Sequence, residues 1–371
     1  MSDDPLLSLD DVSVHFESQN GLLDQFFRRE DKTVRAVDNV SLDIEENDVV
    51  ALIGESGCGK TTIGKTAIGL QRPTSGNVRY RGQDIWEAKD NRNPDIPHDE
   101  IRRSLQIIHQ DPGSSLNRNK TVMHSLEAPL KRWQPGLTRD DRTNRIYAML
   151  EYVGMEPPGD YANRYPHQLS GGETQRVALV RSLLMNPDVI LADEAVSALD
   201  VSLRVEMMDL LLDLQDKFDT SFVFISHNLS NARYLASHSG GRIGIMYLGQ
   251  LVEIGPAEEV LQNPRHPYSQ VLKWATATLD PDQEHARQPP VRRIDIPDPV
   301  NPPSGCRFHT RCPEAREVCG SIEPELVNRE SDSPDHLAAC FRQYPEGEHE
   351  YWRSDPIEDV ETVPSPAEAD D

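Results

Sequence analysis

A segment in the first quarter of the chain has the residue types and spacing needed to bind a chain of phosphates. Residues 54–61 read G-E-S-G-C-G-K-T and follow the short apolar run 49–53. Glycines let the backbone fold around phosphates and aim its N–H groups at them, and a helix that starts at the loop adds positive potential. In this pattern Lys60 reaches the β- and γ-phosphates, and the hydroxyl of Thr61 binds Mg²⁺. The predicted phosphate-binding residues are Gly54, Glu55, Ser56, Gly57, Cys58, Gly59, Lys60, Thr61 and Thr62.

A second segment supplies the acids that phosphate-transfer chemistry needs. The apolar run 189–192 predicts a buried strand, and Asp193 and Glu194 follow it directly. Asp193 is placed to hold Mg²⁺ through water, and Glu194 is placed to polarise an attacking water. A strand that ends in two acids is a weak signal alone. Its pairing with a phosphate-binding loop predicts a nucleotide-hydrolysis site.

A third segment, L-S-G-G-E at residues 169–173, opens a predicted helix. Ser170 and Glu173 fit a capping box, which would account for these two residues by itself. The paired glycines Gly171 and Gly172 cost helix stability, and they leave backbone N–H donors free for an anion. With the two segments above, the sequence resembles the ATP-binding cassette (ABC) ATPases. The resemblance implies that this helix start caps the γ-phosphate of an ATP molecule held by the phosphate loop of a partner cassette.

Further positions match the same family in order along the chain. Gln110 lies at the place of the Q-loop glutamine, and His227 at the place of the switch histidine that contacts the γ-phosphate. Phe16 matches the aromatic residue that stacks on adenine, although an aromatic residue on a strand fits a core position equally well. The resemblance implies Mg²⁺ ligands Thr61, Gln110 and Asp193, catalytic residues Glu194, His227 and Gln110, and a D-loop of Ser197, Ala198, Leu199 and Asp200.

Two positions in these motifs, Ala195 and Cys58, differ from or vary within the family that the chain resembles. Many relatives have proline after the catalytic glutamate, whereas this chain has Ala195. That change removes a restraint on φ but no functional group, so activity is expected to survive. Cys58 occupies a variable position of the phosphate loop, where we expect its backbone rather than its thiol to act.

Three features resemble a narrower group, the ATPase subunits of oligopeptide/dipeptide importers. They are a polar insertion at residues 17–35, the segment Y-P-H-Q at 165–168 before the signature, and N-P-R-H-P-Y at 263–268. The insertion is typical of the second ATPase of such an importer. Related importers of nickel, glutathione or oligosaccharides share these features, because the permease and an external binding protein select the solute.

Four of the five cysteines cluster near the C-terminal end with spacing C-x₅-C-x₆-C-x₂₀-C. Clustered cysteines in a cytoplasmic chain indicate metal or cluster ligands first and disulfides second. Four thiolates can ligate a [4Fe–4S] cluster or a structural zinc ion, and the lack of a C-x₂-C pair weighs against zinc. Some relatives carry an iron–sulfur cluster at such cysteines, and free thiols or disulfides remain open. The candidate cluster ligands are Cys306, Cys312, Cys319 and Cys340.

The elements that must position these residues form an alternating pattern. Short apolar runs alternate with helical patterns, which predicts an α/β fold with a parallel sheet. The resemblance implies a P-loop NTPase cassette with a RecA-like core, an antiparallel β subdomain and a helical subdomain at about residues 112–178. We expect the cassette at 1–262, a small cysteine-rich extension of the oligopeptide-importer type at 263–345, and an acidic, disordered tail at 346–371.

Charge and hydropathy exclude several classes of protein. The 371 residues carry a formal net charge of −24, which argues against a nucleic-acid partner because phosphate binding needs a basic face. Arginine supplies 30 of the 38 basic residues, and this lysine-poor, acid-rich composition suggests a salt-loving host. We find no signal peptide and no run long enough to span a membrane. We therefore expect the chain to stay in the cytoplasm, and the resemblance to importer ATPases implies that it lies at the cytoplasmic face of the cell membrane.

Together these features predict an ATPase that drives peptide import. Its cofactors would be ATP with Mg²⁺ and an iron–sulfur cluster or zinc. Its partners would be a second ABC ATPase subunit, favoured as a paralogue by the insertion, two permease subunits and an extracellular solute-binding protein. One alternative is a soluble ABC ATPase acting on nucleic acid or ribosomes. Another is a redox-sensing interaction protein in which the cysteine module matters more than turnover.

Overall fold

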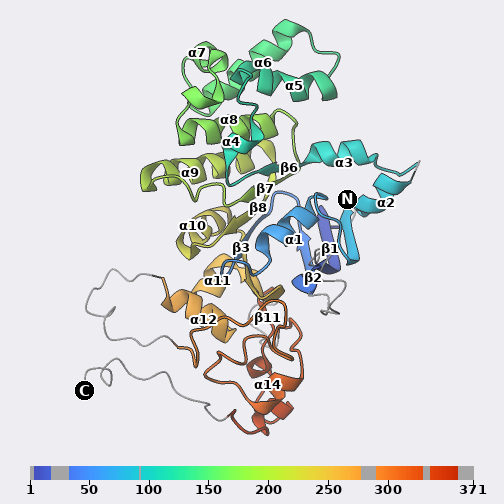
Figure 1. Ribbon diagram of the computed structural model, residues 1–371, viewed down its shortest axis with the longest axis vertical. Coiled ribbons are helices and arrows are strands. Elements are labelled where there is room, and N and C mark those ends of the chain that lie inside the picture. Colours follow the sequence, from blue (N-terminus) through green and yellow to red (C-terminus); the bar gives the residue numbers. More distant parts are fainter. Residues whose placement is uncertain (1–3, 18–32, 92, 277–289, 329–334, 358–371) are drawn as a thin grey trace, which may run out of the picture.

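The computed structural model describes residues 4–17, 33–91, 93–276, 290–328 and 335–357. The predicted insertion at 17–35 lies almost wholly outside these ranges. In Figure 1 a group of helices occupies one end of the molecule, a parallel sheet crosses its middle, and the C-terminal extension occupies the other end.

A seven-stranded sheet forms the centre of the molecule, in the order β11-β10-β9-β3-β8-β7-β6. Strands β6, β7, β8, β3 and β9 run parallel, whereas β10 and β11 are antiparallel to their neighbours. The strands are β3 (Val49–Ile53), β6 (Leu105–Ile108), β7 (Val189–Asp193), β8 (Ser221–Ser226), β9 (Arg242–Tyr247), β10 (Gln250–Pro256) and β11 (Leu337–Ala338). Because parallel strands end at one edge of the sheet, the loops that follow β3, β6, β7 and β8 converge there.

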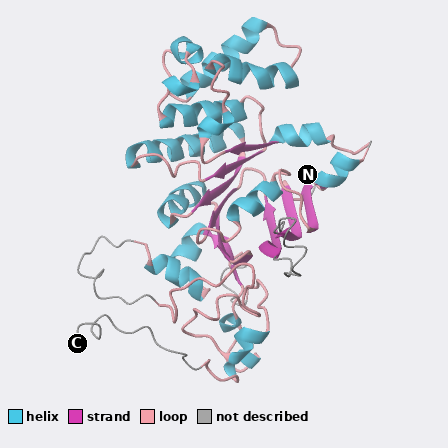
Figure 2. Ribbon diagram, in the orientation of Figure 1, coloured by secondary structure: helices cyan, strands magenta, loops and turns pink. Residues whose placement is uncertain are grey.

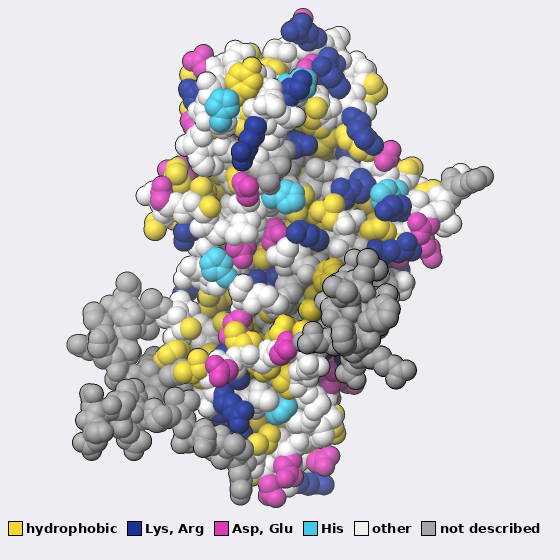
Figure 3. Space-filling view, in the orientation of Figure 1, with side chains coloured by type: hydrophobic (Ala, Val, Ile, Leu, Met, Phe, Trp, Pro, Cys, Tyr) yellow, Lys and Arg dark blue, Asp and Glu magenta, His cyan; other side chains and the backbone are white. Residues whose placement is uncertain are grey.

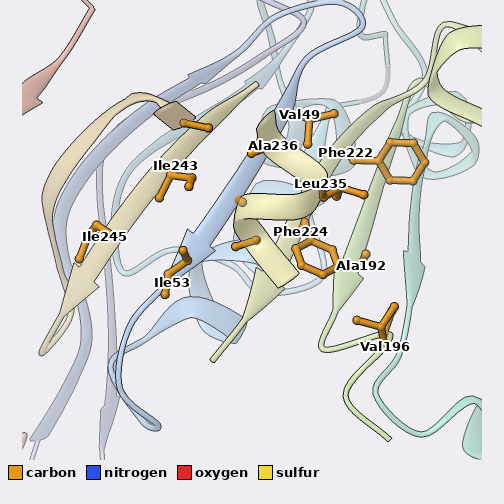
Figure 4. Packing of buried hydrophobic residues seen from close by; sticks show 14 of the residues in the cluster. Val49, Ile53, Ala192, Val196, Phe222, Phe224, Leu235, Ala236, Ile243 and Ile245 are labelled. Atoms are coloured by element: carbon orange, nitrogen blue, oxygen red, sulfur yellow. The ribbon is translucent and has the colours of Figure 1, made fainter. Parts of the chain in front are cut away.

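The central strands are mainly apolar because both faces of the sheet are covered. Side chains alternate between the faces, so Val49, Ala51 and Ile53 enter one core while Val50 and Leu52 enter another. Figure 4 shows the first core, in which Ile53, Phe222 and Phe224 of the sheet meet Leu235 and Ala236 of a helix. The helices around the sheet are α1 (Lys60–Ala67), α9 (Val201–Phe218), α10 (Leu229–Ser239) and α11 (Ala257–Gln262).

A second, antiparallel sheet packs beside α1 in the order β2-β1-β4-β5. Its strands alternate buried and exposed residues, as expected for a sheet with one face on the core. The second core joins this sheet to the central one through α1. The elements of this region are β1 (Leu7–Glu17), β2 (Thr33–Ile44), β4 (Ser75–Tyr80), β5 (Gln83–Asp84), α2 (Ile85–Asp90) and α3 (His98–Ser104).

The helical subdomain has a core of its own. This core extends from Leu116 to Met185, beyond the expected end at 178, because α8 contributes Val177 and Val180 to it. Thr138 starts α6 with a capping box, and Thr121 caps α5. The helices are α4 (Pro112–Ser115), α5 (Val122–Trp133), α6 (Arg139–Tyr152), α7 (Pro158–Asn163), the 3₁₀ helix η2 (Pro166–Gln168) and α8 (Gly171–Leu183).

The C-terminal extension is mainly loop with short helices (Figure 2). Its elements are α12 (Pro267–Trp274), α14 (Glu317–Ser321), the strand β11, and the 3₁₀ helices η3 (Phe341–Gln343) and η4 (Glu350–Trp352). It shares the main core with the cassette, because Tyr268, Phe308 and Ala315 pack in the same cluster as Ile53. The amino-acid sequence therefore changes character near residue 262, as predicted, but the side-chain packing of the cassette and the extension is continuous across that boundary.

A buried carboxylate ties the extension to the cassette. Glu253 of β10 is fully buried and accepts the backbone N–H groups of Arg265 and His266, each at 2.8 Å, and a ring nitrogen of His336 at 2.7 Å. Three donors to one carboxylate satisfy a charge that would otherwise be costly to bury. Residues from three separate segments are thus fixed around one side chain.

The expectation that the chain is disordered from residue 346 is wrong for residues 346–357. Tyr351 of η4 is buried, its hydroxyl donates to the Glu314 carbonyl oxygen at 2.9 Å, and the Arg316 guanidinium lies over its ring. One aromatic anchor therefore orders a segment whose composition is acidic. Residues 358–371 lie outside the described ranges.

Charges are mixed on the visible surface. On the face shown in Figure 3, the described basic side chains are interspersed with acidic and uncharged ones and form no continuous basic patch. Within the described ranges, no helix is long and apolar enough to cross a membrane.

Candidate functional site

The phosphate loop connects the end of β3 to the start of α1. Gly59 has φ 106°, and a Cβ atom there would lie 2.1 Å from the Ala36 carbonyl oxygen. Only glycine fits this turn, because L-residues with side chains avoid such φ values and backbone atoms cannot yield. Gly59 provides no side-chain cap for α1. The first N–H groups of α1 are therefore directed at the position where an anion would lie.

The Lys60 side chain folds back into the phosphate loop and contacts its backbone. Its Nζ donates to the carbonyl oxygens of Gly54 at 2.8 Å and Glu55 at 3.0 Å, and it lies 3.7 Å from Cys58 Sγ. Burial raises the pKa of the Cys58 thiol, so the thiol stays neutral and does not compete for the lysine charge. A phosphate group that enters the loop meets a positive charge already in place.

Oxygen donors suited to a magnesium ion meet beside Lys60. The Thr61 hydroxyl donates to Asp193 Oδ1 at 2.8 Å, which joins the start of α1 to the end of β7. Hydroxyl, carboxylate and amide oxygens are ligands for Mg²⁺, a hard cation that keeps several waters. The residues present therefore fit the predicted ion, with Thr61 and Asp193 as its nearest protein contacts and Gln110 close by.

Glu194 is the centre of the predicted catalytic group. Gln110 Nε2 donates to its Oε2 at 3.0 Å, and His227 Nδ1 lies 3.4 Å from its Oε1. Its backbone has φ 50°, and its N–H donates to the Ile225 carbonyl oxygen at 3.1 Å. A non-glycine residue held in this region is uncommon and points to a position that the surrounding structure dictates. The arrangement can orient a water molecule for attack on a phosphate.

A cavity of about 310 Å³ lies at these parts, although neither Asp193 nor His227 lines it. Eight predicted residues line it: Ser56, Gly57, Gly59, Lys60, Thr61, Thr62, Gln110 and Glu194. Sequence reasoning did not identify the six other lining residues, namely Val34, Arg35, Ala36, Leu248, Gly249 and Pro299. These six come from β2, the β9–β10 turn and the extension, and no short motif in the sequence marks them.

Phe16 is not among the residues that line this cavity, but its partner across the β1–β2 ladder, Val34, is. The Phe16 side chain is 43% exposed, which disfavours the core alternative. An exposed aromatic ring next to a nucleotide-sized cavity fits a stacking surface for adenine. Its stacking role stays a prediction.

The signature segment lies apart from the chain's own cavity. Ser170 Oγ accepts the Glu173 N–H at 3.3 Å, and Glu173 Oε2 accepts the Ser170 N–H at 2.7 Å. That backbone hydrogen bond is the main reason why the pKa of Glu173 is lowered. Gly171 and the Ser170 side chain are not buried, and none of the four signature residues lines the cavity. The signature is therefore open to a partner.

The D-loop connects the catalytic strand to α9. The Ser197 hydroxyl donates to the Glu194 carbonyl oxygen at 2.8 Å, and the Asp200 side chain caps α9 through the Leu203 N–H at 3.0 Å. Leu199 is buried, whereas the next residue but one, Val201, is exposed. This loop couples the Glu194 backbone to a surface at the start of α9.

The four clustered cysteines converge in the extension. All are free, and all line one small cavity together with aromatic side chains that include Phe308 and Tyr351. Burial raises all four thiol pKa values, to about 12 for Cys312 and for Cys340. Within the described residues, no group of three or more His, Cys, Asp or Glu side chains could hold a single metal ion.

Comparison with known families now places the chain. The ABC transporter family matches residues 37–197, and the family described as oligopeptide/dipeptide transporter, C-terminal region, matches residues 252–319. Fold and site together define the class as an ABC-type ATP-binding cassette, an ATP-hydrolysing P-loop protein. The chain belongs to the family of ATP-binding subunits of oligopeptide and dipeptide ABC transporters.

The similarity to curated relatives covers nearly the whole chain. The chain is 39% identical over 340 residues to the oligopeptide transport ATP-binding protein OppF of Salmonella typhimurium, covering 92% of this chain and 97% of the relative. It is 37% identical to AppF of Bacillus subtilis over 335 residues, covering 90% and 96%. A solved dimeric cassette bound to ADP and phosphate matches with a TM-score of 0.56 and 27% identity, over 68% of this chain and 98% of that one.

Proposed function

We propose that this chain is the ATP-hydrolysing motor subunit of an ABC importer that takes up oligopeptides or dipeptides through a membrane permease. The observation that carries the proposal is the match of residues 252–319 to the C-terminal region of oligopeptide/dipeptide transporters, in a chain whose phosphate loop, Asp193 and Glu194 lie together. The long coverage of peptide-transport relatives supports the same conclusion.

The proposed reaction uses the geometry of the site directly. Backbone N–H groups of the phosphate loop and Lys60 bind the phosphates of ATP, and Glu194 orients and polarises the attacking water. Gln110 and His227 hold the Glu194 carboxylate from two sides. Bound Mg²⁺, next to Thr61 and Asp193, would neutralise charge on the transferred phosphate.

The partner for this reaction is a second cassette whose signature segment completes the site. The exposed helix start at Ser170 supports this proposal, because its free N–H groups lie away from the chain's own phosphate loop. ATP that binds best between two closed cassettes shifts the pair towards closure, and hydrolysis reopens it. We further propose that the partner is a paralogue, and that the pair works with two permease subunits and an extracellular solute-binding protein at the cytoplasmic face of the membrane.

Transport in a reconstituted system tests the proposed function. The chain would be assembled with its permease and partner cassette in vesicles, and ATP-dependent uptake of a labelled peptide would be measured. Uptake that competing di- and oligopeptides reduce is the expected result. Uptake inhibited only by nickel, glutathione or an oligosaccharide would assign a different substrate to the importer. Co-purification with ribosomes in place of a permease would contradict the proposal.

The cysteine module is proposed to hold a [4Fe–4S] cluster through Cys306, Cys312, Cys319 and Cys340. Four reduced thiols around one buried cavity suit a four-iron cluster. A single zinc ion needs its four sulfurs at about 2.3 Å from one point, and the described side chains form no such group. When bound, such a cluster would cross-link the module and could exchange one electron.

Spectroscopy of anaerobically purified protein tests the cluster. We expect a brown protein with an absorption band near about 400 nm that Cys312→Ala weakens. A colourless protein that carries stoichiometric zinc would contradict the cluster.

A salt-loving host is also proposed from the net charge of −24. This proposal predicts that the melting temperature of the protein rises with KCl concentration, because salt screens that charge.

A further inference from the structure

The C-terminal extension reaches into the phosphate loop through one arginine. Arg311 Nη1 donates to both carboxylate oxygens of Glu55, at 3.1 Å and 3.0 Å, and also to Tyr247 Oη at 3.3 Å. The Arg311 side chain is only 6% exposed and that of Glu55 is 25% exposed. Glu55 is the second residue of the phosphate loop, although 256 positions separate it from Arg311. Because the pair is mostly screened from water, it is stronger than a surface ion pair.

A tyrosine of the extension holds the backbone of the same loop residue. The Glu55 N–H donates to Tyr268 Oη at 2.9 Å. Tyr268 is fully buried between Tyr247 and Phe308, whose ring centres lie 4.6 Å and 5.4 Å from its own. Burial raises the Tyr268 pKa, so the hydroxyl stays neutral and keeps a lone pair for the loop. The extension therefore fixes both the main chain and the side chain of Glu55.

The residue that is held in this way also positions the phosphate-binding Lys60. The Glu55 carbonyl oxygen accepts a hydrogen bond from Lys60 Nζ at 3.0 Å. Glu55 also adds a negative charge beside a site for a polyanion, and the Arg311 guanidinium offsets that charge. Loss of Arg311 would thus both loosen the loop and leave an unpaired carboxylate next to the bound phosphates.

A second arginine from the same turn holds the opposite wall of the cavity. Arg307 donates to the Leu248 carbonyl oxygen and to Asp38. The neighbouring Gly249 N–H donates to the Cys58 carbonyl oxygen at 2.9 Å, so this wall also connects to the loop. Leu248 and Gly249 both line the nucleotide cavity. The turn that carries Arg307 and Arg311 therefore contacts the site at two places.

We propose that Arg311 and Tyr268 are positioning residues that hold the phosphate loop ready for ATP, so that the C-terminal extension is a working part of the nucleotide site. The proposal rests on the assignment of residues 54–61 as that site. Arg311 precedes Cys312 directly and its turn begins at Cys306, so the shape of the cysteine module sets the position of the arginine. ATP affinity then depends on a module outside the cassette motifs.

Kinetics of the full-length chain test this proposal. We expect Arg311→Met to raise KM for ATP and the dissociation constant of a non-hydrolysable analogue by roughly tenfold, while kcat changes by less than about twofold, since the charge-assisted contact with Glu55 is lost. Arg311→Lys should recover part of the affinity, and Tyr268→Phe should weaken binding without a change in packing. Lys273→Met is the control, because Lys273 is a basic residue of the same extension whose Nζ donates to the Gln262 carbonyl oxygen at 2.8 Å, and it lines neither the cysteine cavity nor the nucleotide cavity.

Two further variants separate the possible outcomes. In a Glu55→Gln background, Arg311→Met should have little additional effect, because the two residues act through one contact. Normal ATP affinity in both Arg311→Met and Tyr268→Phe would overturn the proposal, as would an equal loss in Lys273→Met. Lys60→Ala separates this failure from failure of the site: if it also binds ATP normally, the site assignment itself is wrong.

Discussion

His266 gives a pH-dependent stability that can be calculated from its surroundings. The ring is buried at the start of α12, where Nδ1 accepts the Tyr268 N–H at 3.1 Å, and burial lowers its pKa from 6.5 to about 4. Below pH 6.5 the unfolded chain therefore binds a proton that the folded chain rejects, so stability falls as the pH falls until the folded ring also titrates near pH 4. At 1.36 kcal/mol per pKa unit, the full loss is about 3 kcal/mol, of which about 1 kcal/mol is lost by about pH 5.5.

The variant His266→Asn keeps an acceptor for the helix cap and removes the titrating ring. The measurement is urea unfolding followed by tryptophan fluorescence between about pH 7.5 and pH 5.5, a pH range that stays above the sequence pI of 4.9. We expect the variant to start less stable, because it leaves a cavity beside Phe308, and then to lose about 1 kcal/mol less than the wild type over this range. His124→Asn makes the same change at an exposed position of α5 and is the control. A wild-type pH profile in His266→Asn would refute the reasoning.

Two further predictions concern the site and the ordered end of the chain. Thr61→Val removes the hydroxyl that donates to Asp193, and it should weaken MgATP binding roughly tenfold while binding of ATP in EDTA changes little. Thr66→Val, further along α1, is the isosteric control. Equal effects in both variants would argue against a magnesium contact. Tyr351→Ala should lower the free energy of unfolding by about 3 kcal/mol, because it empties a buried aromatic position, whereas Ile294→Ala, which is 61% exposed, should change it by less than about 0.5 kcal/mol. A negligible effect of Tyr351→Ala in chemical denaturation would mean that residues 346–357 do not contribute to the fold.

The parts of the site that sequence reasoning predicted are encoded by neighbouring residues. A buried strand, a glycine-rich turn and a helix start lie within one stretch of chain, so the phosphate loop can be recognised from its order alone. The capping box of Ser170 with Glu173 and the strand that ends at Asp193 are likewise local, and the structure has both. Local patterns predict local geometry because the contacts involved are few residues apart.

The parts that were missed depend on contacts between distant residues. The strand β11 has two residues and joins the sheet beside β10, which no periodicity could indicate. The pair of Arg311 with Glu55 joins two ordinary charged residues that are far apart in sequence. The left-handed backbone of Glu194 follows from the Ile225 carbonyl oxygen and the D-loop turn, while the residue type gives no sign of it. Acidic composition likewise concealed the ordered segment around Tyr351, because one buried ring outweighs several exposed charges.

The most direct test of ATP-driven cassette closure is hydrolysis by the variant Glu194→Gln. Glutamine keeps the shape of the side chain and its contact with Gln110, so ATP should still bind and two cassettes should remain closed around it. Without the carboxylate that polarises water, the rate of hydrolysis should fall by about 10²- to 10⁴-fold. Glu151→Gln, at an exposed position of α6, is the control and should hydrolyse ATP normally. An ATP-trapped dimer with this loss of turnover is the predicted result, and turnover at the wild-type rate in Glu194→Gln would contradict the assigned role of this site.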